Sequence, residues 1–266
     1  MAMTVDMTGR LALVTGAASG LGKATALKIA EAGGDLFLVD VNADGLAETA
    51  KAVEELGRRA VVHPAELADP DACTRAVAAA VAEFGRLDAL CNIAGIIRMA
   101  HSAEMPREHY LQTIAINLNA PWFLSQAALP HLLEAHGAIV NCASSAALIG
   151  EAYAAAYCAS KAGLVNMTKA MAMEFARRPI RINAVAPGGM ITNIAAGMTF
   201  PSEAEMDLVA RYSGLRGQVE VDDVADLVTL LASPAGRSYH GACISIDAGI
   251  TAGRAASTPL ATAGGR

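Results

Sequence analysis

The sequence contains few charged residues and no segment long and apolar enough to cross a membrane. Only 17% of its 266 residues are charged and 54% are hydrophobic, whereas an average soluble protein carries about 25% charge. The net charge is −6 and no cluster of lysine and arginine occurs, which argues against nucleic acid because binding its phosphates requires dense positive charge. The first ten residues lack the apolar core of a signal peptide. We therefore expect a cytoplasmic protein that binds neither nucleic acid nor a membrane.

The sequence also lacks the cysteine and histidine patterns that are typical of disulfide frameworks and metal sites. Its five cysteines are scattered, odd in number and never spaced as CxxC, and its six histidines form no HExxH motif. The cysteines are Cys73, Cys91, Cys142, Cys158 and Cys243. This distribution favours buried, reduced thiols and predicts no metal site.

What the sequence does contain is a regular alternation of short apolar runs and longer amphipathic stretches. The expected strands are Leu11–Val14, Leu36–Val39, Ala60–Val62, Leu87–Cys91, Ala138–Cys142, Ile180–Val185 and Ala242–Ile246. The expected helices are Gly20–Ala32, Ala43–Leu56, Asp71–Phe84, Arg107–Glu134, Ala155–Arg177 and Val221–Leu231. This order predicts an α/β fold of the Rossmann type, a doubly wound sheet of about seven parallel strands with helices on both faces. Because no long polar linker interrupts the pattern, we expect one domain over residues 1–250 and a flexible tail over 251–266.

A glycine-rich turn follows the first expected strand and leads directly into the first expected helix. The segment reads Thr15-Gly16-Ala17-Ala18-Ser19-Gly20-Leu21-Gly22. In a doubly wound fold this turn binds pyrophosphate: Gly16 permits the tight turn, Gly20 lets backbone approach the phosphate, and Gly22 allows close packing of helix on strand. The N-terminus of the helix offers free N–H groups to the anion. A glycine cluster alone is a weak signal, but strand, glycines and helix occur here in the required order.

Asp40 ends the second expected strand, about 18 residues beyond Gly22. A carboxylate there can accept both ribose hydroxyls of an adenosine and repels a 2′-phosphate. Ser19 and Val41 occupy positions where an arginine could bind that phosphate, and neither is basic. The pattern favours NAD over NADP, although Asp40 could instead only begin a turn with Asn42.

Tyr157 and Lys161 are four residues apart at the start of an expected helix. Positions i and i+4 share one face of a helix, so the phenol and the ammonium can lie in the same cleft. Free tyrosine has a pKa near 10, and we expect the nearby cation to lower it, which makes the phenol usable as a general acid or base. A YxxxK pair alone is again a weak signal, because many solvated helices carry one.

Taken together over about residues 8–250, these motifs resemble those of the NAD-linked group of short-chain dehydrogenase/reductases. Asn92-Ile93-Ala94-Gly95 is similar to the family's NNAG segment, and Pro187-Gly188 follows the sixth expected strand as in the family. The resemblance implies a catalytic set of Asn117, Ser144, Tyr157 and Lys161. It implies cofactor contacts from Gly16, Ser19, Gly20, Leu21, Gly22, Asp40, Val41, Glu66, Leu67, Asn92, Ala94, Gly95, Tyr157, Lys161, Pro187, Gly188, Met190 and Thr192. The sequence departs from the family pattern at Ile93, at Glu66 where aspartate is usual, and at Ala248 within Asp247-Ala248-Gly249.

The resemblance further implies a mechanism and an assembly. Lys161 binds the nicotinamide ribose, Ser144 and Tyr157 hold the substrate oxygen, and Asn117 supports a proton path to the lysine. Residues 190–217 form a lid over a small alcohol or ketone substrate, and the chain forms a homotetramer. Arg98 could pair with a substrate carboxylate, but we favour a surface position for it. A 3-oxoacyl carrier-protein reductase and a non-catalytic NAD-binding sensor or scaffold remain alternatives to an alcohol dehydrogenase.

Overall fold

The protein is built on one seven-stranded parallel sheet, seen here in a computed structural model that describes residues 5–191, 199–209, 214 and 216–253. The strands are β1 (Leu11–Thr15), β2 (Asp35–Asp40), β3 (Ala60–Pro64), β4 (Ala89–Asn92), β5 (Ala138–Cys142), β6 (Arg181–Pro187) and β7 (Cys243–Ile246). Their order across the sheet is β3-β2-β1-β4-β5-β6-β7. The expected doubly wound α/β fold is confirmed.

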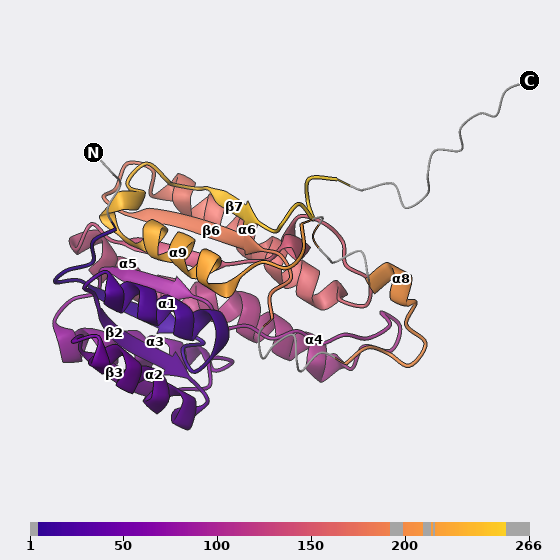
Figure 1. Cartoon of the computed structure of the whole chain (residues 1–266), viewed down its shortest axis with the longest axis horizontal. Helices are drawn as coiled ribbons and strands as arrows, with labels where there is room; N and C mark the ends of the chain where they lie inside the picture. Colours follow the sequence, from indigo (N-terminus) through magenta and orange to yellow (C-terminus); the bar gives the residue numbers. More distant parts are fainter. Residues whose placement is uncertain (1–4, 192–198, 210–213, 215, 254–266) are drawn as a thin grey trace, which may run out of the picture.

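Helices cover both faces of the sheet (Figure 1). They are α1 (Gly20–Glu31), α2 (Ala43–Glu55), α3 (Pro70–Phe84), α4 (Arg107–Ile114), α5 (Ala120–Glu134), α6 (Ala155–Glu174), α8 (Met206–Val209) and α9 (Val221–Ala232). Helices α1, α2 and α9 pack on one face, where α1 and α9 lie side by side, and α3, α5 and α6 pack on the other. Within the described ranges, no helix is both long and apolar enough to cross a membrane.

Alternate residues of the inner strands supply the cores of the two faces. Along β1, Ala12 and Val14 pack toward α1 and α9, while Leu11 and Leu13 pack toward α3 and α5. Side chains of a strand point to opposite faces in turn, so a strand buried on both faces must be apolar throughout. This requirement explains why the strands read as continuous apolar runs in the sequence.

The crevice between β1 and β4 marks the point where the chain reverses its direction across the sheet. β1 pairs with β2 on one side and with β4 on the other. The buried hydroxyl of Thr15, at the end of β1, accepts hydrogen bonds from the backbone N–H groups of Ile93 at 2.9 Å and Ala94 at 3.1 Å. Ligands of open α/β sheets bind at such a reversal, beyond the carboxyl ends of the strands.

The helix expected over Arg107–Glu134 is present but is not regular throughout. A π-helical segment, Ala115–Asn119, joins α4 to α5, and the N–H of the next residue, Ala120, donates to the carbonyl of Ala115. Pro121 has no N–H and cannot donate to the carbonyl of Asn117, four residues earlier, so the α-helical bonding pattern is interrupted there. Such wider turns are frequent at functional sites, and Asn117 lies in this one.

Candidate active site

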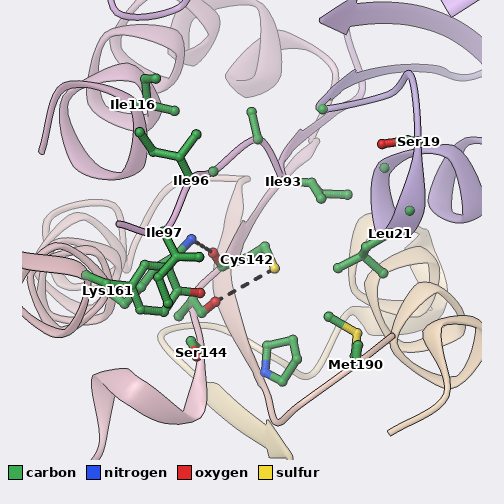
Figure 2. Close-up of a pocket in the computed structure, with 18 of the residues that line it drawn as sticks. Ser19, Leu21, Ile93, Ile96, Ile97, Ile116, Cys142, Ser144, Lys161 and Met190 are labelled. Carbon is green, nitrogen blue, oxygen red and sulfur yellow. Dashed lines mark hydrogen bonds between the residues drawn. The ribbon is translucent and has the colours of Figure 1, made fainter. Parts of the chain in front are cut away.

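An open cleft lies beyond the carboxyl ends of the strands, with about 1570 Å³ of space between protein atoms, part of it open to solvent. Sixteen of the expected cofactor residues line it: Gly16, Ser19, Gly20, Leu21, Gly22, Asp40, Val41, Glu66, Leu67, Ala94, Gly95, Tyr157, Lys161, Pro187, Gly188 and Met190. In the close-up, Ser19, Leu21 and Met190 face the cleft from one side, and Lys161, Ser144 and Ile116 lie on the other (Figure 2).

The glycine-rich turn leaves no room for side chains at two positions. Gly16 has a φ of 68°, and a Cβ there would lie 3.0 Å from backbone atoms of Ala94. A Cβ on Gly22 would lie 2.0 Å from the carbonyl oxygen of Gly16. The turn therefore packs backbone on backbone at the N-terminus of α1, where unpaired N–H groups are available for a phosphate.

Asp40 faces the cleft and also stabilises the glycine-rich turn. One carboxylate oxygen accepts the N–H of Ala18 at 3.2 Å, and the other accepts the N–H of Asn42 at 3.0 Å. Both interpretations of this residue thus have structural support: it begins a turn with Asn42, and it lines the cleft. Val41 beside it is 64% exposed and adds no positive charge. A ligand at this end of the cleft meets a carboxylate without a basic neighbour at positions 19 and 41.

Tyr157 lies in the first turn of α6, and Ser144 precedes a 3₁₀ turn, Ser145–Ala147. Both side chains line the cleft, and the Ser144 hydroxyl accepts the N–H of Ala146 at 3.2 Å. Burial raises the pKa of Tyr157, the nearby Ser144 hydroxyl offsets part of that rise, and the negative charge of Glu151 adds to it. Two hydroxyl groups are therefore positioned to hold one substrate oxygen between them.

Lys161 is only 3% exposed, and its Nζ donates to the carbonyl of Cys142 at 2.7 Å (Figure 2). Its Nζ lies 5.7 Å from the centre of the Tyr157 ring, and burial lowers the pKa of the lysine. The expectation that this cation lowers the pKa of Tyr157 is not met in this geometry, because burial of the phenol is the largest influence on that pKa and raises it.

Asn117 lies behind the cleft wall rather than in it. Its buried amide accepts the N–H of Ile96 and donates to the carbonyl of Ile96, both at 2.8 Å, and it also donates to the Ser160 hydroxyl at 3.1 Å. A Cβ on Gly95 would lie 3.3 Å from the Asn117 amide oxygen and 3.4 Å from Lys161 Nζ. Asn117 thus fixes the segment after β4 close to the lysine.

Asn92 likewise has its side chain under the cleft and does not line it. It donates to the amide oxygen of Asn141 at 2.8 Å, and Asn141 donates to the Thr168 hydroxyl at 2.8 Å. Asn92 and Asn141 are register partners at the ends of β4 and β5, so this buried amide pair ties the two strands to α6. Thr192, the remaining expected cofactor residue, lies outside the described residues.

Two features of the cleft were missed in the sequence. Glu151 lines it six residues before Tyr157, and Ile116 lines it from the π-helical segment. The pairing of Asn92 with Asn141 could have been predicted from the sequence, because each asparagine lies at or next to the end of an apolar strand and those two strands are neighbours. Glu151 lies in an irregular loop, where no periodicity indicates the direction of a side chain.

The chain matches proteins of known family over most of its length. A family model described as Enoyl-(Acyl carrier protein) reductase matches residues 16–251. A cis-4-hydroxycyclohexanecarboxylate dehydrogenase of Sinomonas cyclohexanicum is 37% identical, over 91% of this chain and 97% of the relative. A carveol dehydrogenase of Mycobacterium avium, solved with NAD, superposes with a TM-score of 0.85 at 26% identity, over 94% of this chain and all of the other. A short-chain dehydrogenase of Burkholderia cenocepacia, solved with NADP, superposes with a TM-score of 0.83 at 34% identity, over 92% of this chain and 98% of the other.

Proposed function

The chain belongs to the short-chain dehydrogenase/reductase family, and on that premise we propose that it interconverts a secondary alcohol and a ketone, with NAD as hydride carrier and Tyr157 as general acid/base. The observation that carries the proposal is that Tyr157 and Ser144 bring two hydroxyls into one cleft at the reversal point of the sheet. The named relative and the carveol dehydrogenase both act on ring alcohols according to their names, which supports a cyclic or apolar substrate.

The residues of the cleft fit a dinucleotide. The crowded turn at Gly16 and Gly22 offers backbone N–H groups to the phosphates, and Asp40 offers a carboxylate to the adenosine ribose. Lys161 would bind the other ribose, and Pro187, Gly188 and Met190 would border the nicotinamide. When bound, the nicotinamide supplies the hydride chemistry. Asp40 favours NAD, because a second phosphate beside it would bring two anions together.

The chain's own part in the reaction is to hold one oxygen and move one proton. Ser144 Oγ and Tyr157 Oη hold the substrate oxygen, and Tyr157 Oη takes the hydroxyl proton in oxidation or returns it in reduction. Because burial raises the pKa of Tyr157, the phenol is protonated near neutrality and is ready to act as the acid in ketone reduction. Asn117 acts through the backbone of Ile96 and through Ser160, so it is a positioning residue.

The remaining parts of the proposal concern organisation. Residues 1–250 act as one domain, 190–217 cover the substrate, and 251–266 form a tail. We also propose a cytoplasmic homotetramer. Reduction of a 3-oxoacyl carrier protein is the alternative activity, and Asp40 argues against it, since that biosynthetic role usually uses NADPH.

A screen of secondary alcohols and ketones with NAD and with NADP, followed by nicotinamide absorbance, tests the activity. We expect turnover with NAD, and at least about a 10²-fold loss of turnover in Tyr157→Phe with dinucleotide binding retained. Tyr110→Phe, which changes an exposed tyrosine of α4 outside the cleft, is the control. A folded wild-type protein that turns over none of these compounds contradicts the proposed activity. Near-normal turnover by Tyr157→Phe contradicts the role of the phenol.

A further inference from the structure

Glu151 places a carboxyl group in the cleft beside the two hydroxyls. It lines the cleft together with Ser144, Ser145 and Tyr157, and its charge is one of the influences that raise the pKa of Tyr157. The carboxyl is therefore within electrostatic range of the phenol at which a substrate oxygen would bind. The activity proposed above gives this carboxyl no role.

The position of Glu151 is fixed by its backbone. Its N–H donates to the sulfur of Cys158 at 3.4 Å, and its carbonyl accepts the N–H of Ala154 at 3.3 Å. Both partners belong to the start of α6 or to the residue before it, the same part of the chain that carries Tyr157. The carboxyl thus has a defined place relative to the phenol, although it lies in an irregular loop.

The carboxyl group has little of its hydrogen-bonding capacity used. Within the described residues, its carboxyl accepts a hydrogen bond from one side chain, the Ser145 hydroxyl, at a long 3.4 Å from Oε1, and no ion pair there includes it. Burial raises the pKa of Glu151, and the bond with Ser145 offsets part of the rise. A carboxylate can accept about four hydrogen bonds, so a donor on a ligand would find free acceptor sites.

Positive charge does not balance this carboxyl in the described part of the cleft. Lys161 is the cation among the residues that line it, and its Nζ is bound to the carbonyl of Cys142. Arg98 is exposed and does not line the cleft. Among the described residues that line the cleft, a substrate carboxylate placed here would therefore meet Glu151 with no guanidinium beside it.

Part of the cleft wall is apolar. Ile96, Ile97 and Ile116 line the cleft on the same side as Lys161 (Figure 2). In a mainly apolar pocket, a small number of polar groups that point toward the ligand fix its orientation. A ring with one apolar face and one polar edge matches this combination of isoleucines and a carboxyl.

We infer that Glu151 determines substrate specificity: it accepts a hydrogen bond from a second hydroxyl on the alcohol substrate and disfavours substrates that carry a carboxylate. The inference rests on the proposed alcohol–ketone activity and narrows its substrate class to neutral cyclic diols and related polyols. Hydroxycarboxylates, the class named for the Sinomonas relative, are then poor substrates for this chain.

Two pairs of compounds measure the two parts of the inference. Cyclohexanol and 1,2-cyclohexanediol differ by a hydroxyl donor, and 4-hydroxycyclohexanecarboxylate and its carboxamide differ by a charge. For the wild type, we expect kcat/KM to favour the diol over cyclohexanol by about tenfold or more, as for a hydrogen bond to a charged group. We expect a preference of similar size for the carboxamide over the carboxylate.

Two variants separate charge from hydrogen bonding. Glu151→Gln removes the charge but keeps an acceptor, so the discrimination against the carboxylate should fall about tenfold while part of the diol preference remains. Glu151→Leu should abolish both preferences. Glu108→Gln, an exposed acid on α4, is the matched control for net charge and should change neither ratio.

The outcomes distinguish this inference from the activity on which it rests. If wild type and Glu108→Gln oxidise these alcohols but Glu151→Gln leaves the carboxylate-to-carboxamide ratio unchanged, the inference is overturned and the proposed function stands. An unchanged diol-to-cyclohexanol ratio in Glu151→Leu also overturns it. A uniform loss of kcat/KM for all four compounds in Glu151→Gln shows a purely structural role for the contact with Ser145. If no alcohol is oxidised by any of the proteins, the proposed function itself fails.

Discussion

The two halves of the cleft are built in different ways. The half that fits a dinucleotide is made by backbone: a turn with no space for a Cβ at Gly22, strand ends, and the start of α1. The half beside Tyr157 is made by side chains from three separate places: the segment after β4, the loop before α6, and the π-helical segment. A tightly packed backbone turn accepts few amino acids at its positions, whereas side chains on loops can be replaced without changing the fold.

This contrast separates the features that identify the family from those that set substrate specificity. Strand, glycine turn and helix follow from packing constraints, so they identify the fold and the type of cofactor. The part of the cleft lined by Ile96, Ile97, Ile116 and Glu151 depends on individual side chains. The four predictions below test this division between a backbone-built and a side-chain-built half.

Adding a methyl group to the glycine-rich turn, in the backbone-built half, should have the largest effect on dinucleotide binding. In Gly22→Ala the new Cβ would overlap the carbonyl of Gly16 at 2.0 Å, so the turn must rearrange. We expect dinucleotide affinity to fall by at least about 10²-fold, which is about 2.7 kcal/mol, as measured by calorimetry. Gly150→Ala is the control in the other half, because a Cβ there meets nothing within 4 Å. Equal losses in both variants would remove the distinction between the halves.

The rate of alcohol oxidation should depend strongly on pH. Burial raises the pKa of Tyr157, so the phenol is mostly protonated at neutral pH and only its deprotonated fraction can accept the substrate's proton. That fraction rises with pH below the pKa, so kcat/KM for oxidation should increase between pH 6 and 8 by up to about tenfold per unit. Ketone reduction uses the protonated phenol and should change little over the same range. An oxidation rate that is flat from pH 6 to 8 would show that Tyr157 does not titrate as the base.

The contrast between the halves also explains what the sequence could and could not predict. β5 has the expected bounds, Ala138–Cys142, because a strand buried on both faces must be an apolar run. β4 begins at Ala89 rather than Leu87. Asp88 instead accepts hydrogen bonds through its side chain from Arg10, Arg86 and the N–H of Leu11.

Sequence patterns predicted the site less well than the fold, because tertiary contacts decide the environment and orientation of each side chain. The family resemblance predicts a cofactor contact for Asn92 and a catalytic role for Asn117. In the structure, the amides of both residues are hydrogen-bonded to protein groups behind the cleft. The pKa of Tyr157 was expected to fall because Lys161 is four residues away, yet burial outweighs that proximity. Neither burial of a phenol nor the direction of Glu151 follows from helical spacing.

Removing the charge at the adenosine end should alter the choice of dinucleotide. Asp40→Asn removes the anion while keeping one acceptor for the N–H groups of Ala18 and Asn42. Two charges about 4 Å apart interact by about 1 to 4 kcal/mol near a protein surface. We therefore expect the NAD-to-NADP ratio of kcat/KM to fall by about tenfold, with the alcohol preference unchanged. Asp44→Asn, an exposed acid at the start of α2, should leave the ratio unchanged. A wild type that already prefers NADP would contradict the role given to Asp40.

The smallest effect is expected from a hydroxyl that joins segments of the side-chain-built half. Tyr153 has a φ of 65°, its carbonyl accepts the N–H of Ala100 at 2.9 Å, and its ring meets His101 edge-on at 5.1 Å between centroids. Its hydroxyl accepts the N–H of Glu205 at 2.8 Å, which links the 199–209 segment to the loop before α6. Tyr153→Phe removes only that link, with a net cost of about 0.5–1.5 kcal/mol.

We expect this substitution to raise the KM for the alcohol by a few-fold, because a substrate then has to order the freed segment, and to leave dinucleotide affinity unchanged. Steady-state kinetics and dinucleotide titration of the same preparation measure both, with Tyr110→Phe as the control. A matching loss of dinucleotide affinity would mean that the 199–209 segment acts on the whole cleft, and that the two halves are not independent.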